Sequence, residues 1–178
     1  GCSRADVDYS FENYRHFRLD IKDEPAVKKM FQTIRKNYGH IDVLINNAGI
    51  STKNYALLTS VLELNKVMDT NFVGAVIFCR EAIKLMKKIC FGRIINISSI
   101  HVQLGMEGTS LYGSSKASLE HYSNVLAKEI FQYGITVNTL SLSIVEGTGM
   151  NDSLSDHIKF EILNSTISKS ILSSNDIT

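Results

Sequence analysis

The sequence is poor in the residues that encode covalent cross-links and structural metal sites. Its 178 residues include three cysteines, one proline and no tryptophan. Cys2, Cys79 and Cys90 form no C-x-x-C pair, so neither a disulfide framework nor a structural zinc site is predicted, and we expect no bound metal. Scattered, reduced thiols are typical of a cytoplasmic protein, which is the location we expect here.

An excess of charge of one sign and a long apolar run are also lacking. Nineteen Lys and Arg against eighteen Asp and Glu give a formal net charge of +1, so we predict neither a nucleic-acid partner nor an anionic membrane partner. The longest apolar run, residues 72–79, is far shorter than the roughly 20 residues of a membrane span. A hydrophobic content of 44% with 21% charged residues predicts one globular domain over residues 1–178.

Short apolar runs alternate with longer segments of helical periodicity along the chain. Asp23 is a typical N-cap, and Pro25 lies in the first turn, where its missing N–H costs no hydrogen bond. We predict strands at residues 14–19, 41–45, 92–98 and 135–142, and helices at residues 24–38, 59–88 and 110–133. This alternation predicts an α/β fold, a doubly wound Rossmann-type parallel sheet with helices on both faces. Such folds bind ligands at the carboxyl ends of their strands.

Polar and small residues follow two of the predicted strands. Asn46-Asn47-Ala48-Gly49 comes directly after the strand at 41–45, and the Ala-Gly pair lets a ligand approach the backbone closely. The amides could tie strand ends together or bind a sugar hydroxyl, although an ordinary strand exit has the same composition. Ser98 and Ser99 end the strand that begins at Gly92, and serines there alone more often serve a turn.

Tyr112 and Lys116 lie four residues apart in a predicted helix and therefore on one face of it. A phenol with a pKa near ~10 is no base at neutral pH, but a nearby ammonium favours the phenolate. We therefore expect Lys116 to lower the pKa of Tyr112. Asn71 is a polar residue in an otherwise apolar helix, which indicates either a local bond to the backbone or a bound water on a proton path.

In this order along the chain, residues 46–49, Asn71, Ser99 and the Tyr112…Lys116 pair resemble the motifs of the short-chain dehydrogenase/reductase family. The resemblance covers essentially all 178 residues. It implies an NAD(P)(H)-dependent oxidoreductase that moves a hydride between nicotinamide and a carbonyl or secondary alcohol. By resemblance, Tyr112 is the general acid/base and Ser99 orients the substrate oxygen. Lys116 would also hold the ribose hydroxyls, and Asn71 would hold a relay water.

The same resemblance implies where the cofactor and the substrate bind. Arg4 stands just past the family's second strand, where a basic residue pairs with the 2′-phosphate of NADP(H). We therefore favour NADP(H), while Asp6 and Asp8 nearby keep NAD(H) open. The loop between Ser99 and Tyr112 would line the substrate pocket, unless it is simply solvated. The implied cofactor residues are Arg4, Asp20, Ile21, Asn47, Ala48, Gly49, Val145 and Thr148, and the implied pocket residues are His101, Gln103 and Met106.

The chain also departs from the family. The Gly-rich phosphate loop with the first strand and helix, and the last strand, are absent, so we expect these residues to be part of a longer polypeptide, incomplete at both ends. Leu142-Ser143 stands where the family usually has Pro-Gly, which weakens the assignments of Val145 and Thr148.

The closest resemblance is to β-ketoacyl-carrier-protein reductases. Those enzymes have basic residues where this chain has Cys90 and Tyr133. A carrier-bound acyl group, a small carbonyl compound and a sugar derivative therefore all remain candidate substrates. A non-catalytic scaffold of the same fold is the alternative function. The resemblance further implies a homo-oligomer, a dimer or tetramer, assembled through the helical segment 59–88 and the helix that carries Tyr112.

Overall fold

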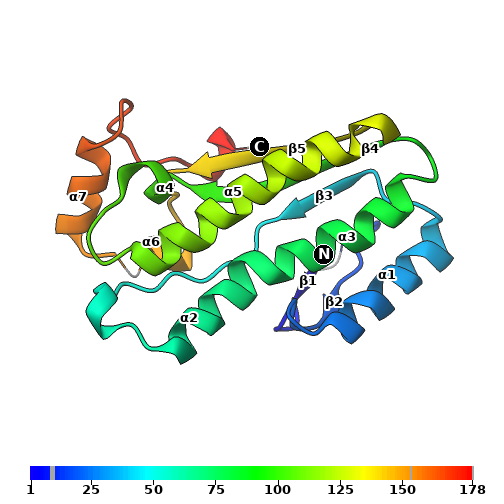
Figure 1. Cartoon of the computed structure of the whole chain (residues 1–178), viewed down its shortest axis with the longest axis horizontal. Coiled ribbons are helices and arrows are strands. Elements are labelled where there is room, and N and C mark those ends of the chain that lie inside the picture. Colours follow the sequence, from blue (N-terminus) through cyan, green and yellow to red (C-terminus); the bar gives the residue numbers. More distant parts are fainter. Residues whose placement is uncertain (9–10, 153, 178) are drawn as a thin grey trace.

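The computed structural model describes residues 1–8, 11–152 and 154–177. Its strands form two parallel sheets (Figure 1). The smaller sheet pairs β1 (Cys2–Ser3) with β2 (Phe17–Arg18), and the larger has the order β3 (Val43–Asn46), β4 (Gly92–Ser99), β5 (Ile135–Leu142). The predicted α/β class and parallel pairing are confirmed, although the strand predicted at residues 14–19 is only two residues long.

The helices follow the predicted segments closely. The long segment predicted at 59–88 consists of α2 and α3 with a π-helical turn, Asp69–Val73, between them. The predicted helix at 110–133 consists of α5 and a short 3-10 turn, Phe131–Tyr133. The α-helices are α1 (Glu24–Tyr38), α2 (Val61–Met68), α3 (Gly74–Met86), α4 (His101–Leu104), α5 (Ser110–Ile130), α6 (Gly149–Asp152) and α7 (Asp156–Asn164). No described helix is both long and apolar enough to cross a membrane.

Local chemistry sets the bounds of α1. The Asp23 carboxylate accepts a hydrogen bond from the backbone N–H of Ala26 at 3.0 Å, as an N-cap does. Gly39 ends the helix with a φ of +81°, a conformation that costs glycine little. Val27 and Phe31, one turn apart, are buried in the core, which confirms the face predicted from the sequence.

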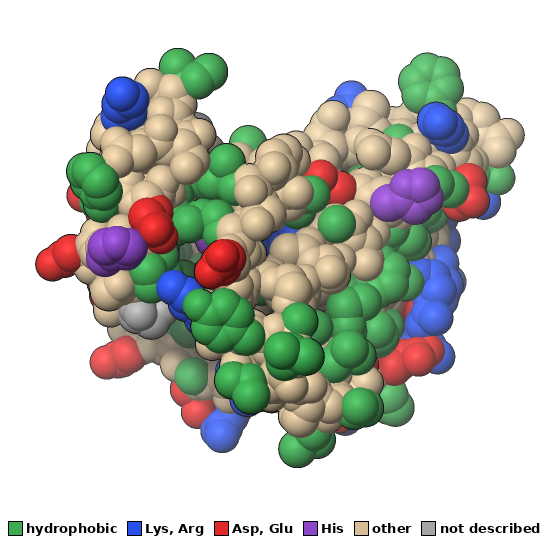
Figure 2. Space-filling view, turned by 60° about the vertical axis from the view of Figure 1, so that its left-hand side comes forward, with side chains coloured by type: hydrophobic (Ala, Val, Ile, Leu, Met, Phe, Trp, Pro, Cys, Tyr) green, Lys and Arg blue, Asp and Glu red, His purple; other side chains and the backbone are tan. Residues whose placement is uncertain are grey.

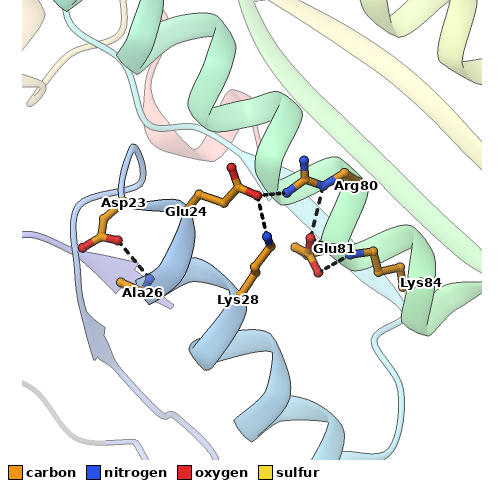
Figure 3. A network of polar contacts seen from close by, with 7 residues as sticks. All are labelled: Asp23, Glu24, Ala26, Lys28, Arg80, Glu81 and Lys84. Carbon is orange, nitrogen blue, oxygen red and sulfur yellow. Dashed lines mark hydrogen bonds and ion pairs between the residues drawn. The ribbon is translucent and has the colours of Figure 1, made fainter.

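An ion-pair network on the outer surface joins α1 to α3 (Figure 3). Glu24 pairs with Lys28 at 2.6 Å and with Arg80 of α3 at 2.7 Å. Arg80 also reaches Glu81, whose carboxylate accepts from Lys84 at 2.7 Å. Apart from the buried Glu81, these groups are partly exposed to solvent, so the network stabilises the packing of the two helices only modestly.

A network of buried polar side chains joins the larger sheet to α5. Asn46 of β3 donates to the Oδ1 of Asn96 at 2.8 Å, and Asn96 donates to Ser123 of α5 at 2.7 Å. Asn46 thus ties neighbouring strand ends together, one of the two roles predicted for it. The thiol of Cys79 lies in the same network, and burial raises its pKa to about 12. The described cysteines are all free thiols.

The opposite face of β3 is exposed. Val43 and Ile45 alternate with the buried Leu44, and their side chains are 48% and 59% exposed. Helices are predicted on both faces of the sheet, but in the described part of the chain the buried residues of α3 and α5 form their core on the Leu44 side. Apolar side chains also remain exposed near the start of α2, among them Leu57 and Leu62. Figure 2 looks toward this end of the molecule and shows many hydrophobic side chains at the surface.

A groove of about 640 Å³ lies between β1 of the small sheet and β3 of the large one. Its walls come from both sheets and from the apolar sides of α1 and α3, including Met30, Phe31 and Phe78. Among the described strands, the larger sheet ends at β3, which pairs only with β4. The groove therefore lies where the resemblance to the family puts a central strand.

Candidate functional site

Three of the predicted catalytic side chains line one cavity at the carboxyl ends of β4 and β5. Ser99 is the last residue of β4, whereas Tyr112 and Lys116 come from the first turns of α5. The cavity has a volume of about 1370 Å³. Tyr112 is 7% exposed and Lys116 is 3% exposed. The four-residue spacing thus brings both to one wall, as a shared helix face requires.

The surroundings of Tyr112 differ from the prediction in one respect. Burial raises the pKa of Tyr112, and its hydrogen bond with Ser99 acts in the opposite direction. The predicted partner, Lys116, instead donates its Nζ proton to the carbonyl oxygen of Ile97 at 2.8 Å. Burial also lowers the pKa of Lys116 to about 8. The protein groups around the phenol therefore raise its pKa, opposite to the predicted direction, because desolvation of the anion outweighs the one hydrogen bond.

Asn71 joins the loop after β3 to α5. It lies in the π-helical turn between α2 and α3, and such turns occur frequently at functional sites. Its Oδ1 accepts from the N–H of Ile50 at 2.8 Å, and its Nδ2 donates to the carbonyl of Ile50 and to Ser115, both at 2.9 Å. Ser115 donates in turn to the carbonyl of Tyr112 at 2.7 Å. The alternative of a local backbone bond is wrong, because Ile50 is 21 residues away.

Gly49 lies against two of these polar groups. A Cβ at this position would be 3.4 Å from both the Oδ1 of Asn71 and the Nζ of Lys116. The backbone at Gly49 is therefore in close contact with the side chains of Asn71 and Lys116, and the approach of a ligand to this backbone stays a prediction. Residues 47–50 line both the groove and the cavity, so the two spaces adjoin at this loop.

The other residues implied for the cofactor divide between the two spaces. Asp20 accepts from the backbone N–H of Lys22 at 3.0 Å, and Ile21 packs against Gly74, where a Cβ would be 2.8 Å from its Cδ1. Thr148 donates to the carbonyl of Val145 at 2.9 Å. Arg4, Asp20 and Ile21 line the groove, Val145 and Thr148 line the cavity, and Asn47, Ala48 and Gly49 line both.

Two of the three implied substrate residues line the cavity, and one does not. His101 and Met106 contribute to its wall. Gln103 is exposed and does not line it, so its assignment to the pocket is wrong. The predicted loop contains the short helix α4, and two residues of helix amount to a rotation of roughly 200°. Gln103 is therefore turned away from the side on which His101 faces the cavity.

Several functional contacts were not predicted from the sequence. Ser115 precedes Lys116 directly, and its full burial between Asn71 and Tyr112 gives it a role in fixing the start of α5. The position beside Lys116 was the signal that could have found it. The backbone groups of Ile50 and Ile97 that bind Asn71 and Lys116 carry no sequence signal, because every residue has them. Within the described residues, no three His, Cys, Asp or Glu side chains are arranged to hold a metal ion.

Two reductases from other organisms are similar in sequence to this chain. The 3-oxoacyl-acyl-carrier-protein reductase FabG of Escherichia coli strain K12 is 32% identical over 161 residues, which are 90% of this chain and 66% of that protein. The 3-oxoacyl-acyl-carrier-protein reductase of Bos taurus is 33% identical over 139 residues, 78% of this chain and 58% of that protein. The chain thus spans less than two thirds of the length of these relatives.

Solved structures are similar over nearly the whole chain. The structure of ElxO with NADP bound superposes on this chain with a TM-score of 0.84 at 30% sequence identity. The superposition covers 93% of this chain and 68% of the ElxO chain. A Tyr-to-Phe variant of ElxO with NADPH bound has a TM-score of 0.83 at 29% identity, with coverages of 94% and 70%. The family described as short chain dehydrogenase matches residues 7–159. The chain therefore belongs to the short-chain dehydrogenase family.

Proposed function

We propose that the protein is an NADP(H)-dependent oxidoreductase that interconverts a carbonyl compound and a secondary alcohol. One observation carries the proposal: Ser99, Tyr112 and Lys116 line a single cavity at the carboxyl ends of parallel strands, where ligands of such folds bind. The hydrogen bond between Ser99 and Tyr112 gives a substrate oxygen two adjacent polar partners. Membership of the family supports the same reaction class.

The described residues fit a nicotinamide cofactor. The groove and the cavity adjoin at residues 47–50, which gives an extended molecule a continuous path past Gly49 to Tyr112. When bound, the cofactor supplies or accepts the hydride. Arg4 lines the groove and supplies a cation for a 2′-phosphate, so we favour NADP(H), with NAD(H) as the alternative. The NADP and NADPH bound in the two ElxO structures support this preference.

Tyr112 is the proposed proton donor when the carbonyl is reduced. Burial raises the pKa of its phenol, so the neutral acid form predominates at neutral pH, and this is the form that protonates a developing alkoxide. Ser99 hydrogen-bonds the same oxygen and holds it in reach of the phenol. Lys116 and Asn71 hold the start of α5 and the loop after β3 in place beside Ser99 and Tyr112. The neutral form of Tyr112 is thus the form that the reductive half of this reversible reaction needs.

The proposed substrate is a 3-oxoacyl group, free or carrier-bound. The curated relatives carry the name 3-oxoacyl-acyl-carrier-protein reductase. Tyr133 replaces a basic residue of those enzymes, but the ammonium of Lys87 lies 3.7 Å from the centre of its ring and supplies a positive charge close by. A sugar or small-alcohol substrate is the second candidate, favoured by the polar His101 in the wall of the cavity.

Steady-state kinetics distinguish these substrates. NADPH oxidation is measured at matched concentrations of a 3-oxoacyl thioester, a small ketone and a keto sugar, and again with NADH. We expect the largest kcat/KM for the 3-oxoacyl thioester with NADPH. A larger value for the sugar or the ketone would move the assignment to the second candidate, and no turnover with any of them would favour the non-catalytic scaffold.

Two assembly features belong to the proposal. A further parallel strand would fill the groove between β1 and β3, and helices would cover the exposed Val43 and Ile45. We also propose a homo-oligomer, a dimer or tetramer. Leu57, shortly before α2, is 99% exposed and Leu62, in the first turn of α2, is 81% exposed, and association would bury this apolar surface. Sedimentation tests this assembly, with a monomer at micromolar concentration as the contrary result.

Location in the cytoplasm stays a prediction, which cell fractionation tests.

A further inference from the structure

His101 touches both Ser99 and Tyr112, although no family motif of the sequence analysis includes it. It is the first residue of α4 and follows β4 after one intervening residue. Its Nδ1 is 3.0 Å from the Oγ of Ser99, and its backbone N–H donates to the same oxygen at 3.3 Å. Its ring meets the ring of Tyr112 edge-on, with the centroids 5.6 Å apart. Ser99, His101 and Tyr112 therefore form one cluster in which each residue contacts the other two.

We propose that His101 is a positioning residue, which holds the Ser99 hydroxyl so that its proton is donated to the substrate oxygen. This inference rests on the proposed oxidoreductase function, because it gives Ser99 a substrate oxygen to bind. His101 acts through Ser99 and makes no contact with the substrate itself.

The hydrogen-bonding capacity of a serine hydroxyl carries the argument. The group has one proton to donate and two lone pairs that accept. The backbone N–H of His101 fills one lone pair of Ser99. If Nδ1 carries a proton, it fills the second lone pair, and the serine proton is left for another acceptor. If Nδ1 is unprotonated, it takes the serine proton itself, and Ser99 can no longer donate to a substrate.

The surroundings of His101 fix its backbone next to the start of α5. The carbonyl of His101 accepts from the N–H of Gly105 at 3.2 Å, and it lies 3.4 Å from the point where a Cβ on Gly113 would stand. The glycine at 113 thus lets α4 pack closely on α5. Burial lowers the pKa of His101, so the ring is neutral near pH 7 and one nitrogen alone carries the proton. The proposal assigns that proton to Nδ1.

The competing reading is that His101 binds the substrate directly through Nε2. Two amide side chains separate the readings, because the amide of Asn lies where Nδ1 of His lies and the amide of Gln reaches the place of Nε2.

Steady-state kinetics of H101N, H101Q and H101L are compared with the wild type. We expect H101N to retain kcat within about 3-fold, and H101Q and H101L to lose roughly 100-fold in kcat at unchanged KM for NADPH. An active H101Q with an inactive H101N would overturn the proposal in favour of direct binding, and wild-type kcat in H101L would overturn both readings.

A double-mutant cycle with Ser99 adds a test that a merely structural role would not pass. If His101 acts through Ser99, then H101L costs nothing further in the S99A background. A second loss of the same size in that background would contradict the proposal. The nitrogen chemical shifts of His101 give a readout that does not need turnover: the wild type should have the Nδ1–H tautomer, and S99A should change the balance. If the wild type has the Nδ1–H tautomer but turns over no substrate, the proposed function is wrong and the role of His101 is not affected. If the wild type has the Nε2–H tautomer, the proposed role of His101 is wrong.

Discussion

Lys116 reaches from α5 to β4 and donates its Nζ proton to the carbonyl oxygen of Ile97 at 2.8 Å. Lys116 is 3% exposed, and among the described residues no carboxylate lies within 4 Å of its ammonium as an ion-pair partner. Burial accordingly lowers its pKa to about 8. An ammonium kept in such a place is costly to the fold, which is expected of a functional residue rather than a stabilising one.

Replacing Lys116 by Met should therefore stabilise the protein and abolish turnover. We expect the free energy of unfolding at pH 7 to rise by about 2 kcal/mol, because the variant no longer buries a charge. The folded pKa lies below the unfolded value, so the unfolded state binds more protons between the two. The stability of the wild type then rises as the pH increases from 8 toward ~10.4, and the advantage of K116M shrinks over the same range. Urea denaturation at pH 7 and pH 10 measures both, with the exposed K128M on the same helix as the control. A loss of stability in K116M at pH 7 would contradict this view of the lysine.

Asn71 should behave in the opposite way. Asn71→Ala removes the hydrogen bonds to Ile50 and Ser115 and leaves buried groups without partners, which should lower the free energy of unfolding by about 2–4 kcal/mol. The exposed Asn124 of α5 offers the matched control, since N124A should change stability by less than about 0.5 kcal/mol. Chemical denaturation of both variants is the measurement. Equal stabilities of N71A and N124A would show that the π-helical turn does not depend on these bonds.

The groove predicts an uneven pattern of amide exchange in the larger sheet. Within the part of the chain that the structure describes, β3 pairs with β4 alone, whereas β4 is paired on both sides. In the 178-residue chain on its own, the amides of Val43–Asn46 that face the groove should exchange much faster than those of Gly92–Ser99. Hydrogen–deuterium exchange resolved to single amides checks this. Protection of β3 as strong as that of β4 in a monomer would refute the proposal that a further strand belongs in the groove.

The sequence predicted the features that depend on local spacing. The four-residue separation of Tyr112 and Lys116 brings both to one wall, because the period of a helix is fixed. The Asp23 cap and Gly39 bounded α1 correctly for the same reason. Asn46 and Asn71 were found because polar residues at strand ends or inside apolar helices need a partner, whereas Ser99 was found through the resemblance to the family.

The remaining features depend on contacts between distant segments. The π-helical turn at Asn71 forms around a bond to Ile50, which a helical pattern does not reveal. The place of Gln103 depended on α4, a helix of four residues that is too short to leave a periodicity. The direction of the pKa shift of Tyr112 followed from burial and from where Lys116 donates its proton, and both are tertiary properties.

The role of Tyr112 as the general acid/base is best tested by the turnover of the Tyr112→Phe variant. The change removes only the phenolic hydroxyl, so the cavity keeps its shape and the ring of His101 keeps its neighbour. Tyr38→Phe, on the exposed side of α1, is the control for the loss of a hydroxyl elsewhere. NADPH oxidation and NADPH binding are measured for both variants and the wild type. We expect Y112F to lose about 1000-fold or more in kcat and to bind NADPH within about 3-fold of the wild type, and we expect Y38F to be unchanged. Wild-type kcat in Y112F would contradict the assignment of Tyr112 as the general acid/base.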